Sequence, residues 1–147
     1  MRSRPNTAAA VAALLFAVVL LGGCGDDEGS GGGGGDGGGL SVEVEPAAVA
    51  PGGTLAASVV NETDREFSYG AGYELERQRG TSGGFEPVDL GDRAVIQIAY
   101  VAEPGGRGPA VAVKVPRGAE PGTWRVIIAR DVPGGGDLGA EFEVKDG

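Results

Sequence analysis

The 147-residue chain contains no histidine, one cysteine and one methionine. Without histidine there is no imidazole general base, no Ser-His-Asp triad and no histidine-ligated metal site, and a copper site of His and Met ligands is excluded as well. The single cysteine, Cys24, excludes an intrachain disulfide and any zinc or iron–sulfur centre that needs several thiolates. The inventory therefore predicts a protein that is not an enzyme, with no catalytic residue, no metal site and no cofactor.

Basic residues are also scarce, 12 against 21 acidic residues, for a net charge of −9. Residues 1–23 carry +2, residues 24–39 carry −4, and residues 40–147 carry −7 from 10 basic and 17 acidic side chains. A protein of this charge has no electrostatic footprint for nucleic acid and is repelled by anionic lipid head groups. Nucleic acid is therefore excluded as a partner.

No apolar run is long enough for a typical transmembrane helix. The longest, residues 8–21, has 14 residues and follows the short basic segment 1–5. As a helix it would measure roughly 21 Å, short of the ~30 Å hydrocarbon core of a bilayer. A basic start followed by a short apolar run is typical of a secretory signal, so residues 1–23 are predicted to be a cleaved signal peptide.

The apolar run ends in Leu21-Gly22-Gly23-Cys24. This sequence resembles the lipobox of bacterial lipoprotein precursors, in which an aliphatic residue and two small residues precede a cysteine. The resemblance implies that the Cys24 thiol receives a diacylglyceryl group and that a signal peptidase cleaves between Gly23 and Cys24. The mature protein would then be lipid-anchored through Cys24 on the extracytoplasmic face of the cell membrane. An ordinary secretory signal followed by an unrelated cysteine is the alternative.

Glycine, 30 residues in all, is concentrated after this motif. Residues 25–39 contain ten glycines, four acidic residues, one serine and no apolar residue. Such a segment cannot bury surface to offset its ordering entropy, so residues 24–39 are predicted to be the lipidated cysteine and a disordered tether with a reach of roughly 20 Å. The GxGxxG matches inside it lack the preceding strand and following helix that a phosphate loop requires.

Residues 40–147 show the two-residue alternation of half-buried strands, separated by Gly/Pro turns, with no helix of ten residues or more. The pattern predicts an all-β fold, an immunoglobulin-like β-sandwich of seven to eight antiparallel strands. Residues 95–101 are almost continuously apolar, which predicts a central strand covered on both faces. The predicted core is Val42, Val44, Leu55, Val59, Phe67, Leu75, Ile96, Ile98, Val113, Trp124, Val126, Ile128, Phe142 and Val144.

Four stretches of this domain are similar to bacterial immunoglobulin-like domains of lipoproteins and surface proteins. They are Val59-Val60-Asn61-Glu62-Thr63, Phe67-Ser68-Tyr69-Gly70 with Tyr73-Glu74-Leu75-Glu76, Gly122-Thr123-Trp124-Arg125-Val126, and Ala140-Glu141-Phe142-Glu143-Val144. The resemblance implies the fold and carries no catalytic residues, because that group shares none. Asn61-Glu62-Thr63 also matches a glycosylation sequon, but we interpret it as a strand end at a turn.

Three sets of side chains are candidates for chemistry. Glu74 and Glu76 lie two apart on a strand, a spacing that a glycosidase could use, although two acids on a solvent face are the expected reading. Four loop carboxylates are of the type that binds calcium but show no repeated ligand spacing. These carboxylates are Asp89, Asp92, Asp131 and Asp137. Tyr69 and Tyr73 are weak candidates for ligand binding, since exposed aromatic rings stack on sugars, but both are expected at the rim of the core.

These observations favour a non-enzymatic, lipid-anchored module that mediates protein–protein interaction at the cell envelope through its loops or a strand edge. The membrane, through diacylglyceryl-Cys24, and another envelope protein are the expected partners. The alternative function is a surface lipoprotein that binds a small ligand or a carbohydrate.

Overall fold

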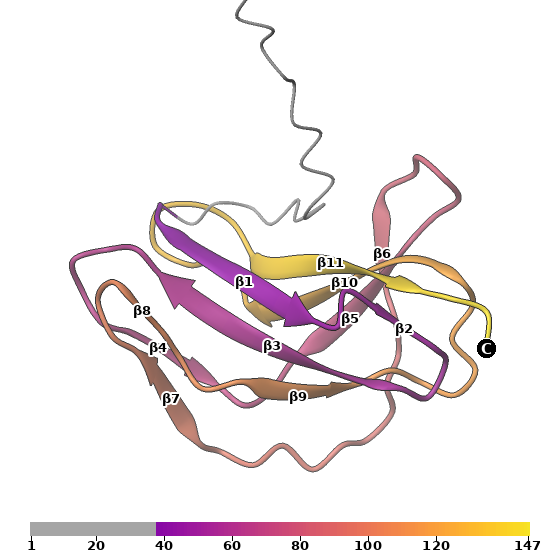
Figure 1. Cartoon of the computed structure of the whole chain (residues 1–147), viewed down its shortest axis with the longest axis horizontal. Helices are drawn as coiled ribbons and strands as arrows, with labels where there is room; N and C mark the ends of the chain where they lie inside the picture. The colour runs from indigo at the N-terminus through magenta and orange to yellow at the C-terminus, as the bar shows by residue number, and fades with distance from the viewer. Residues whose placement is uncertain (1–37) are drawn as a thin grey trace, which may run out of the picture.

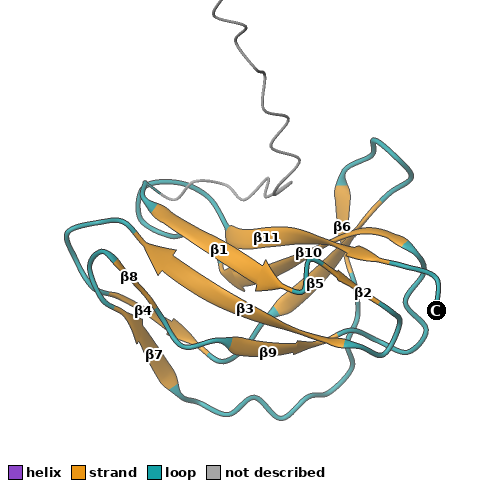
Figure 2. Cartoon of the chain, viewed as in Figure 1, coloured by secondary structure: helices purple, strands orange, loops and turns teal. Residues whose placement is uncertain are grey.

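The computed structural model describes residues 38–147. The predicted signal peptide, the cleavage site at Gly23 and Cys24, and the tether as far as residue 37 lie outside the described residues. From Gly38 onward the chain forms eleven strands and no helix (Figure 2). This part of the chain accordingly contains no helix that could cross a membrane.

The strands follow the alternation and the turns of the sequence. Their bounds are β1 Leu40–Glu45, β2 Ala48–Val49, β3 Thr54–Asn61, β4 Phe67–Gly70, β5 Glu74–Gln78, β6 Phe85–Pro87, β7 Ala99–Ala102, β8 Gly106–Arg107, β9 Val111–Lys114, β10 Gly122–Ala129 and β11 Leu138–Val144. The all-β prediction is confirmed. The strands outnumber the predicted seven to eight because β2 and β8 have two residues each and β6 has three.

Two sheets face each other in the sandwich (Figure 1). One sheet contains β1, β3, β8 and β9, with β1 on one edge of β3 and both β8 and β9 on the other. The second has the order β2-β11-β10-β5-β6. The chain changes sheets at Pro46 and Ala47, so that β2 pairs with β11 in parallel, the one departure from the predicted antiparallel pairing among the described strands. A two-stranded ribbon, β4-β7, lies beside these sheets.

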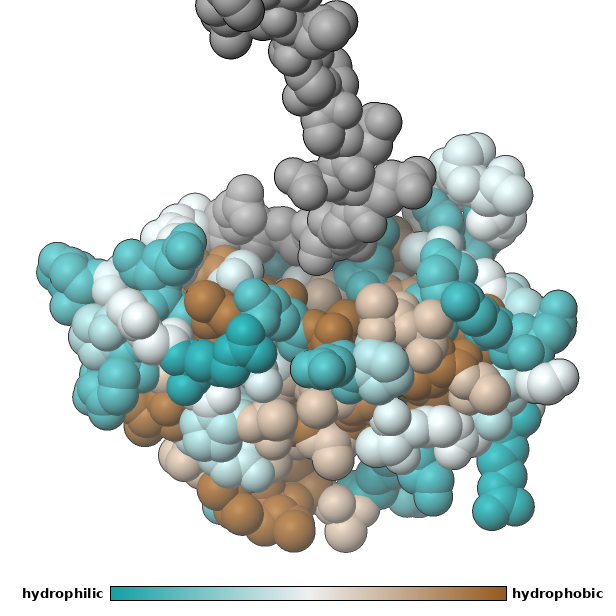
Figure 3. All heavy atoms as spheres, viewed as in Figure 1, coloured by the Kyte–Doolittle hydropathy of each residue, from teal (hydrophilic) through white to brown (hydrophobic). Residues whose placement is uncertain are grey.

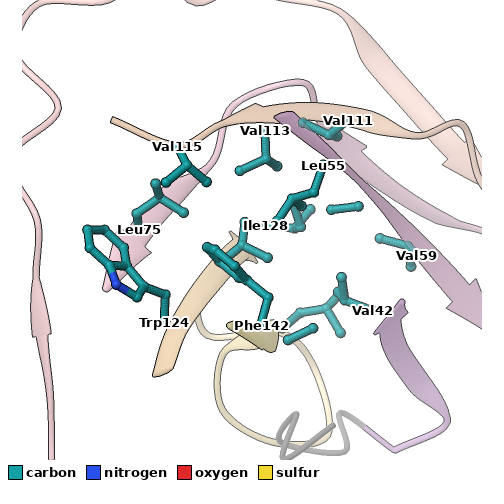
Figure 4. Close-up of a cluster of buried hydrophobic side chains, with 14 of the residues drawn as sticks. Val42, Leu55, Val59, Leu75, Val111, Val113, Val115, Trp124, Ile128 and Phe142 are labelled. Carbon is teal, nitrogen blue, oxygen red and sulfur yellow. The ribbon is translucent and has the colours of Figure 1, made fainter. Parts of the chain in front are cut away.

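The core lies between the sheets and is built from alternate residues of the long strands (Figure 4). Trp124 and Ile128 of β10 point inward with Phe142 of β11, opposite Leu55 and Val59 of β3 and Val113 of β9. Val126 and Val144 are buried in the same cluster. The indole nitrogen of Trp124 donates to the Glu120 carbonyl oxygen at 2.9 Å. Of the fourteen predicted core residues ten are buried, and Val44 and Phe67 pack at the core's edge.

The prediction for residues 95–101 is wrong. Only Ala99–Ala102 forms a strand, and Ile96 and Ile98, predicted in the core, are 69% and 44% exposed. The physical reason is that the central positions of the second sheet are taken, because β10 already has β11 on one edge and β5 on the other. The apolar run is left to form half of the β4-β7 ribbon and the loop before it.

Candidate functional site

Residues 91–99 form a segment that we call the strap, in which every residue is exposed. Val95, Ile96 and Ile98 are 56%, 69% and 44% exposed, and Val101 just beyond the strap is 36% exposed. In Figure 3 hydrophobic side chains gather at the lower edge of the molecule, where the loop between β6 and β7 runs in Figure 1. Large exposed apolar patches are common at interaction sites.

The strap is held to the body of the domain at its two ends. Near its start, the Arg93 guanidinium donates to the Tyr73 carbonyl oxygen at 2.7 Å and lies over the Tyr73 ring, 4.2 Å from its centroid. At its end, Ala99 enters β7 and pairs with Gly70 of β4. Between these points Val95, Ile96 and Ile98 stay largely exposed.

A groove of about 880 Å³ runs beside the strap. It is lined by β4 and the turn after it, by residues 95–99 and by the end of β10, residues 127–130. The groove forms where the pairing of β5 with β10 ends, at Glu74 opposite Ile127. The residues before β5 do not continue this pairing, because the chain turns at Gly70-Ala71-Gly72 and β4 pairs with β7 instead. The last residues of β10 therefore have no strand neighbour on that edge in the described structure.

Tyr69, a predicted ligand-binding candidate, contributes to the fold instead. Its side chain is only 5% exposed and its hydroxyl donates to the Pro109 carbonyl oxygen at 2.5 Å. Its ring contacts Phe67 and Tyr100, with centroids 6.3 Å and 5.6 Å away. Burial, together with the nearby Tyr100, raises the pKa of the Tyr69 phenol. A buried, bonded ring offers no platform for a sugar.

Tyr73 is half-buried and its polar atom is also engaged. Its hydroxyl accepts a hydrogen bond of 2.9 Å from the Lys114 backbone N–H and donates to the Lys114 carbonyl oxygen at 3.4 Å. Because Arg93 covers its ring, neither predicted tyrosine presents a free aromatic face to solvent. Tyr73 does line the groove, and its role there is to hold the strap.

The pair Glu74 and Glu76 belongs to an ion-pair lattice on the outer face of β5 and β10. Glu76 was predicted on a solvent face, but it is 5% exposed and accepts hydrogen bonds from Arg125 Nε at 2.8 Å and Arg130 Nη2 at 2.9 Å. Arg130 also binds Glu74 and Asp137. Both carboxylates are therefore bonded to arginines.

The pKa values of this lattice follow from its contacts. Burial raises the pKa of the Glu76 carboxyl, but the hydrogen bonds and charges of Arg125 and Arg130 outweigh burial and hold the pKa below its ordinary value. The hydrogen bond from Arg130 likewise lowers the pKa of Asp137, and the bond to Glu74 is the main cause of the raised pKa of Arg130. A lattice of this kind keeps the charged forms and stabilises the sheet.

The calcium candidates do not converge. Asp137 is bound to Arg130, and Asp89 accepts a hydrogen bond of 2.8 Å from the Gly91 backbone N–H. Within residues 38–147 no three metal-binding side chains come together.

Asn61 is fully buried at the end of β3, as expected for a strand end at a turn. Its amide nitrogen donates to the carbonyl oxygens of Arg65 and Ala102 at 2.6 Å and 2.9 Å, and its amide oxygen accepts from the backbone and the hydroxyl of Thr63. The amide is thus fully used, and the sequon residue is a structural link between β3, its turn and β7.

The exposed strap is the candidate feature that the sequence did not indicate. An apolar run such as Val95-Ile96-Gln97-Ile98 gives the same signal in a buried strand and in an exposed segment. No residue type in this run distinguishes an exposed segment from a buried strand. Whether the run is buried therefore depends on how the neighbouring strands pair.

Comparison with known proteins leaves the family open. No protein-family model and no curated protein matches the chain. Among solved structures, the alkylpurine DNA glycosylase AlkC of Pseudomonas fluorescens bound to DNA with an abasic site analog matches with a TM-score of 0.40 and 18% identity, over 73% of this chain and 30% of that chain. The sporulation control protein Spo0M of Bacillus subtilis matches with a TM-score of 0.41 and 12% identity, over 76% and 49%. The chain spans less than half the length of either protein.

Proposed function

We propose that this protein is a non-enzymatic, lipid-anchored, extracytoplasmic immunoglobulin-like module that binds another protein of the cell envelope. The observation that carries the binding role is the strap, where Val95, Ile96 and Ile98 remain 44% to 69% exposed beside a groove. Elsewhere in the described domain the adjacent Val101 is the one other exposed large apolar side chain. A concentration of apolar surface at one place favours recognition of a partner there.

The anchor and the tether support the envelope location. The sequence Leu21-Gly22-Gly23-Cys24 supplies the lipidation site, and residues 25–39 supply a reach of roughly 20 Å. Confinement near one membrane raises the effective concentration of partners in the same envelope, which suits a weak interaction.

A carbohydrate-binding or small-ligand-binding lipoprotein has less support. Tyr69 is buried, the ring of Tyr73 is covered by Arg93, and the groove is open to solvent rather than enclosed. Small-ligand sites are typically concave enough to bury most of the ligand.

The anchor is tested with Cys24→Ser. We expect this variant to appear in the soluble fraction or to stay uncleaved, whereas the unchanged chain sediments with membranes. Normal cleavage and membrane fractionation of Cys24→Ser would contradict the lipid anchor.

The binding role is tested in cells with a photo-crosslinking amino acid at Gln97 in the strap. The matched control carries the same amino acid at Ser82, an exposed residue of the β5–β6 turn. We expect one specific crosslinked protein from position 97 and none from position 82. If neither these positions nor a scan of the other exposed loops captures a protein, the interaction role fails.

A further inference from the structure

We infer that the partner bound at the strap is a protein segment that combines apolar side chains with a basic end, and that it lies in the groove between β4 and the end of β10. The inference rests on the proposed function and deepens it by naming the chemistry of the partner. Three observations carry it: the apolar wall of the groove, the acidic residues at one end of the β4-β7 ribbon, and the position of the strap relative to the start of the domain.

The apolar wall selects an apolar occupant. Val95, Ile96 and Ile98 of the strap stand on one side of the groove, with Ile127 and Ile128 of β10 among its lining residues. The charged lining residues, Glu74 and Arg130, are already paired with each other. An occupant gains free energy here by covering the three exposed strap side chains, since burial of apolar area is the main driving force of association.

Unpaired acids lie at one end of the ribbon. Glu66 precedes Phe67, which pairs with Ala102, and Glu103 follows Ala102, so both acids lie at the same end of β4-β7. Asp131 follows Arg130, a lining residue of the groove. All three acids are exposed and form no ion pair within residues 38–147. A basic residue at the matching end of the occupant would meet Glu66 and Glu103, and the excess of acids over the domain would steer it there.

Two other occupants fit these observations less well. The chain's own segment 25–37 contains no apolar residue and cannot cover the strap. A second copy would bring a domain of net charge −7 against another of −7, a repulsive encounter.

The membrane is also a poorer match. The domain begins beside the Asn61–Glu62 end of β3, where the Glu62 N–H donates to the Gly39 carbonyl oxygen at 2.7 Å. Figure 1 places the start of β1 and the strap at opposite edges of the molecule. The predicted tether therefore joins the domain at the edge opposite the strap.

The test uses the full chain and three labelled octapeptides in fluorescence anisotropy: KKVTVTVT, EEVTVTVT and KKSTSTST. The first carries an apolar face and a basic end, the second reverses the charge, and the third removes the apolar face. We expect the first peptide to bind at least about tenfold more tightly than the other two.

Matched variants place the site. Ile96→Ser/Ile98→Ser should weaken binding of KKVTVTVT by at least about tenfold while leaving the thermal unfolding midpoint unchanged, because both side chains are exposed. Glu66→Lys/Glu103→Lys should weaken binding of KKVTVTVT by a similar factor and strengthen binding of EEVTVTVT. The control Glu45→Lys/Asp146→Lys makes the same change in net charge at two exposed acids outside the groove lining, and should leave binding within about twofold.

Four results would overturn the inference: no binding of KKVTVTVT, equal binding of KKVTVTVT and EEVTVTVT, equal loss in the control variant, or unchanged binding in Ile96→Ser/Ile98→Ser. Binding to phosphatidylcholine–phosphatidylglycerol vesicles that the strap variant abolishes would assign the surface to a membrane. A dimer in sedimentation that this variant dissociates would assign it to a second copy. Should the peptides fail while another face of the domain forms a specific crosslink in cells, the proposed function survives and only the groove assignment falls.

Discussion

The Tyr69 hydroxyl donates a hydrogen bond to the carbonyl oxygen of Pro109, 40 residues away in the chain. This bond ties the β4-β7 ribbon to the segment between β8 and β9, and so supports one wall of the groove from inside the domain. Tyr69, whose ring made it a candidate for ligand stacking, therefore positions the ribbon instead.

Tyr69→Phe tests this role. It should lower the free energy of unfolding by about 1–2 kcal/mol, because the Pro109 carbonyl oxygen loses its partner while the ring packing stays. Chemical denaturation monitored by tryptophan fluorescence measures the change. The half-buried Tyr73, whose hydroxyl lies nearer solvent, should lose less in Tyr73→Phe. Equal stability of Tyr69→Phe and the unchanged chain would mean that the bond contributes nothing.

Gly108 should not tolerate a side chain. A Cβ at this position would lie 2.8 Å from Tyr69 Cε1, closer than a real Cβ contact, and the buried ring has no room to withdraw. Gly108→Ala should cost about 1–3 kcal/mol of stability, as overpacking does. Gly118→Ala is the matched control, since a Cβ there meets nothing within 4 Å, and it should be neutral or slightly stabilising. A neutral Gly108→Ala would show that the ring is less constrained than its contacts imply.

Stability should fall in acid through Glu76. Its pKa in the folded state lies below the unfolded value of about 4.3, so the unfolded chain binds the proton first as pH falls. The contribution of Glu76 is therefore fully present above about pH 5 and is lost as pH falls through the folded-state pKa. Glu76→Gln should lower stability at pH 7 by about 1–3 kcal/mol and flatten the dependence below pH 5.

Glu74→Gln is the comparison for that experiment. The Glu74 side chain is 61% exposed and shares Arg130 with Glu76, so its removal should change stability and acid sensitivity less. Urea unfolding from pH 3 to pH 7 separates the two variants. An equal slope with pH in Glu76→Gln and the unchanged chain would remove Glu76 as a source of acid sensitivity.

Asn61→Ala should be among the more damaging single substitutions, with a loss of about 2 kcal/mol or more. It leaves the Ala102 carbonyl oxygen buried without its donor and removes three further hydrogen bonds of the turn after β3. Its neighbour Glu62 is exposed, so Glu62→Ala should be nearly neutral. Thermal unfolding of both variants provides the check, and similar midpoints would show that the Asn61 bonds are dispensable.

Local sequence predicted most of the strands because a half-buried strand records its own environment. Leu40, Val42 and Val44 alternate with polar residues, and β1 covers Leu40–Glu45. The same alternation located β10 and β11, whose Trp124 and Phe142 lie in the core as predicted. The lipidation of Cys24 and the tether stay predictions, since they lie outside the described residues.

The candidate site was less predictable, because each of its properties depends on distant partners. Whether Val95-Ile96-Gln97-Ile98 is buried depends on which strands flank β10, and those strands are brought together only by the fold. The Glu76 carboxylate is paired with Arg125 and Arg130, which lie 49 and 54 residues later in the chain. The Tyr69 hydroxyl is hydrogen-bonded to the carbonyl oxygen of Pro109, 40 residues later in the chain.

Composition and alternation alone determined which residue types the protein lacks and where most of its strands lie, because both are properties of residues and their immediate neighbours. The tertiary structure alone decided which apolar and charged groups remain available. Strand pairing depends on which segments the fold brings together, and the apolar run before β7 pairs with no strand of the second sheet. That outcome left an exposed strap and a groove on an otherwise well-packed domain.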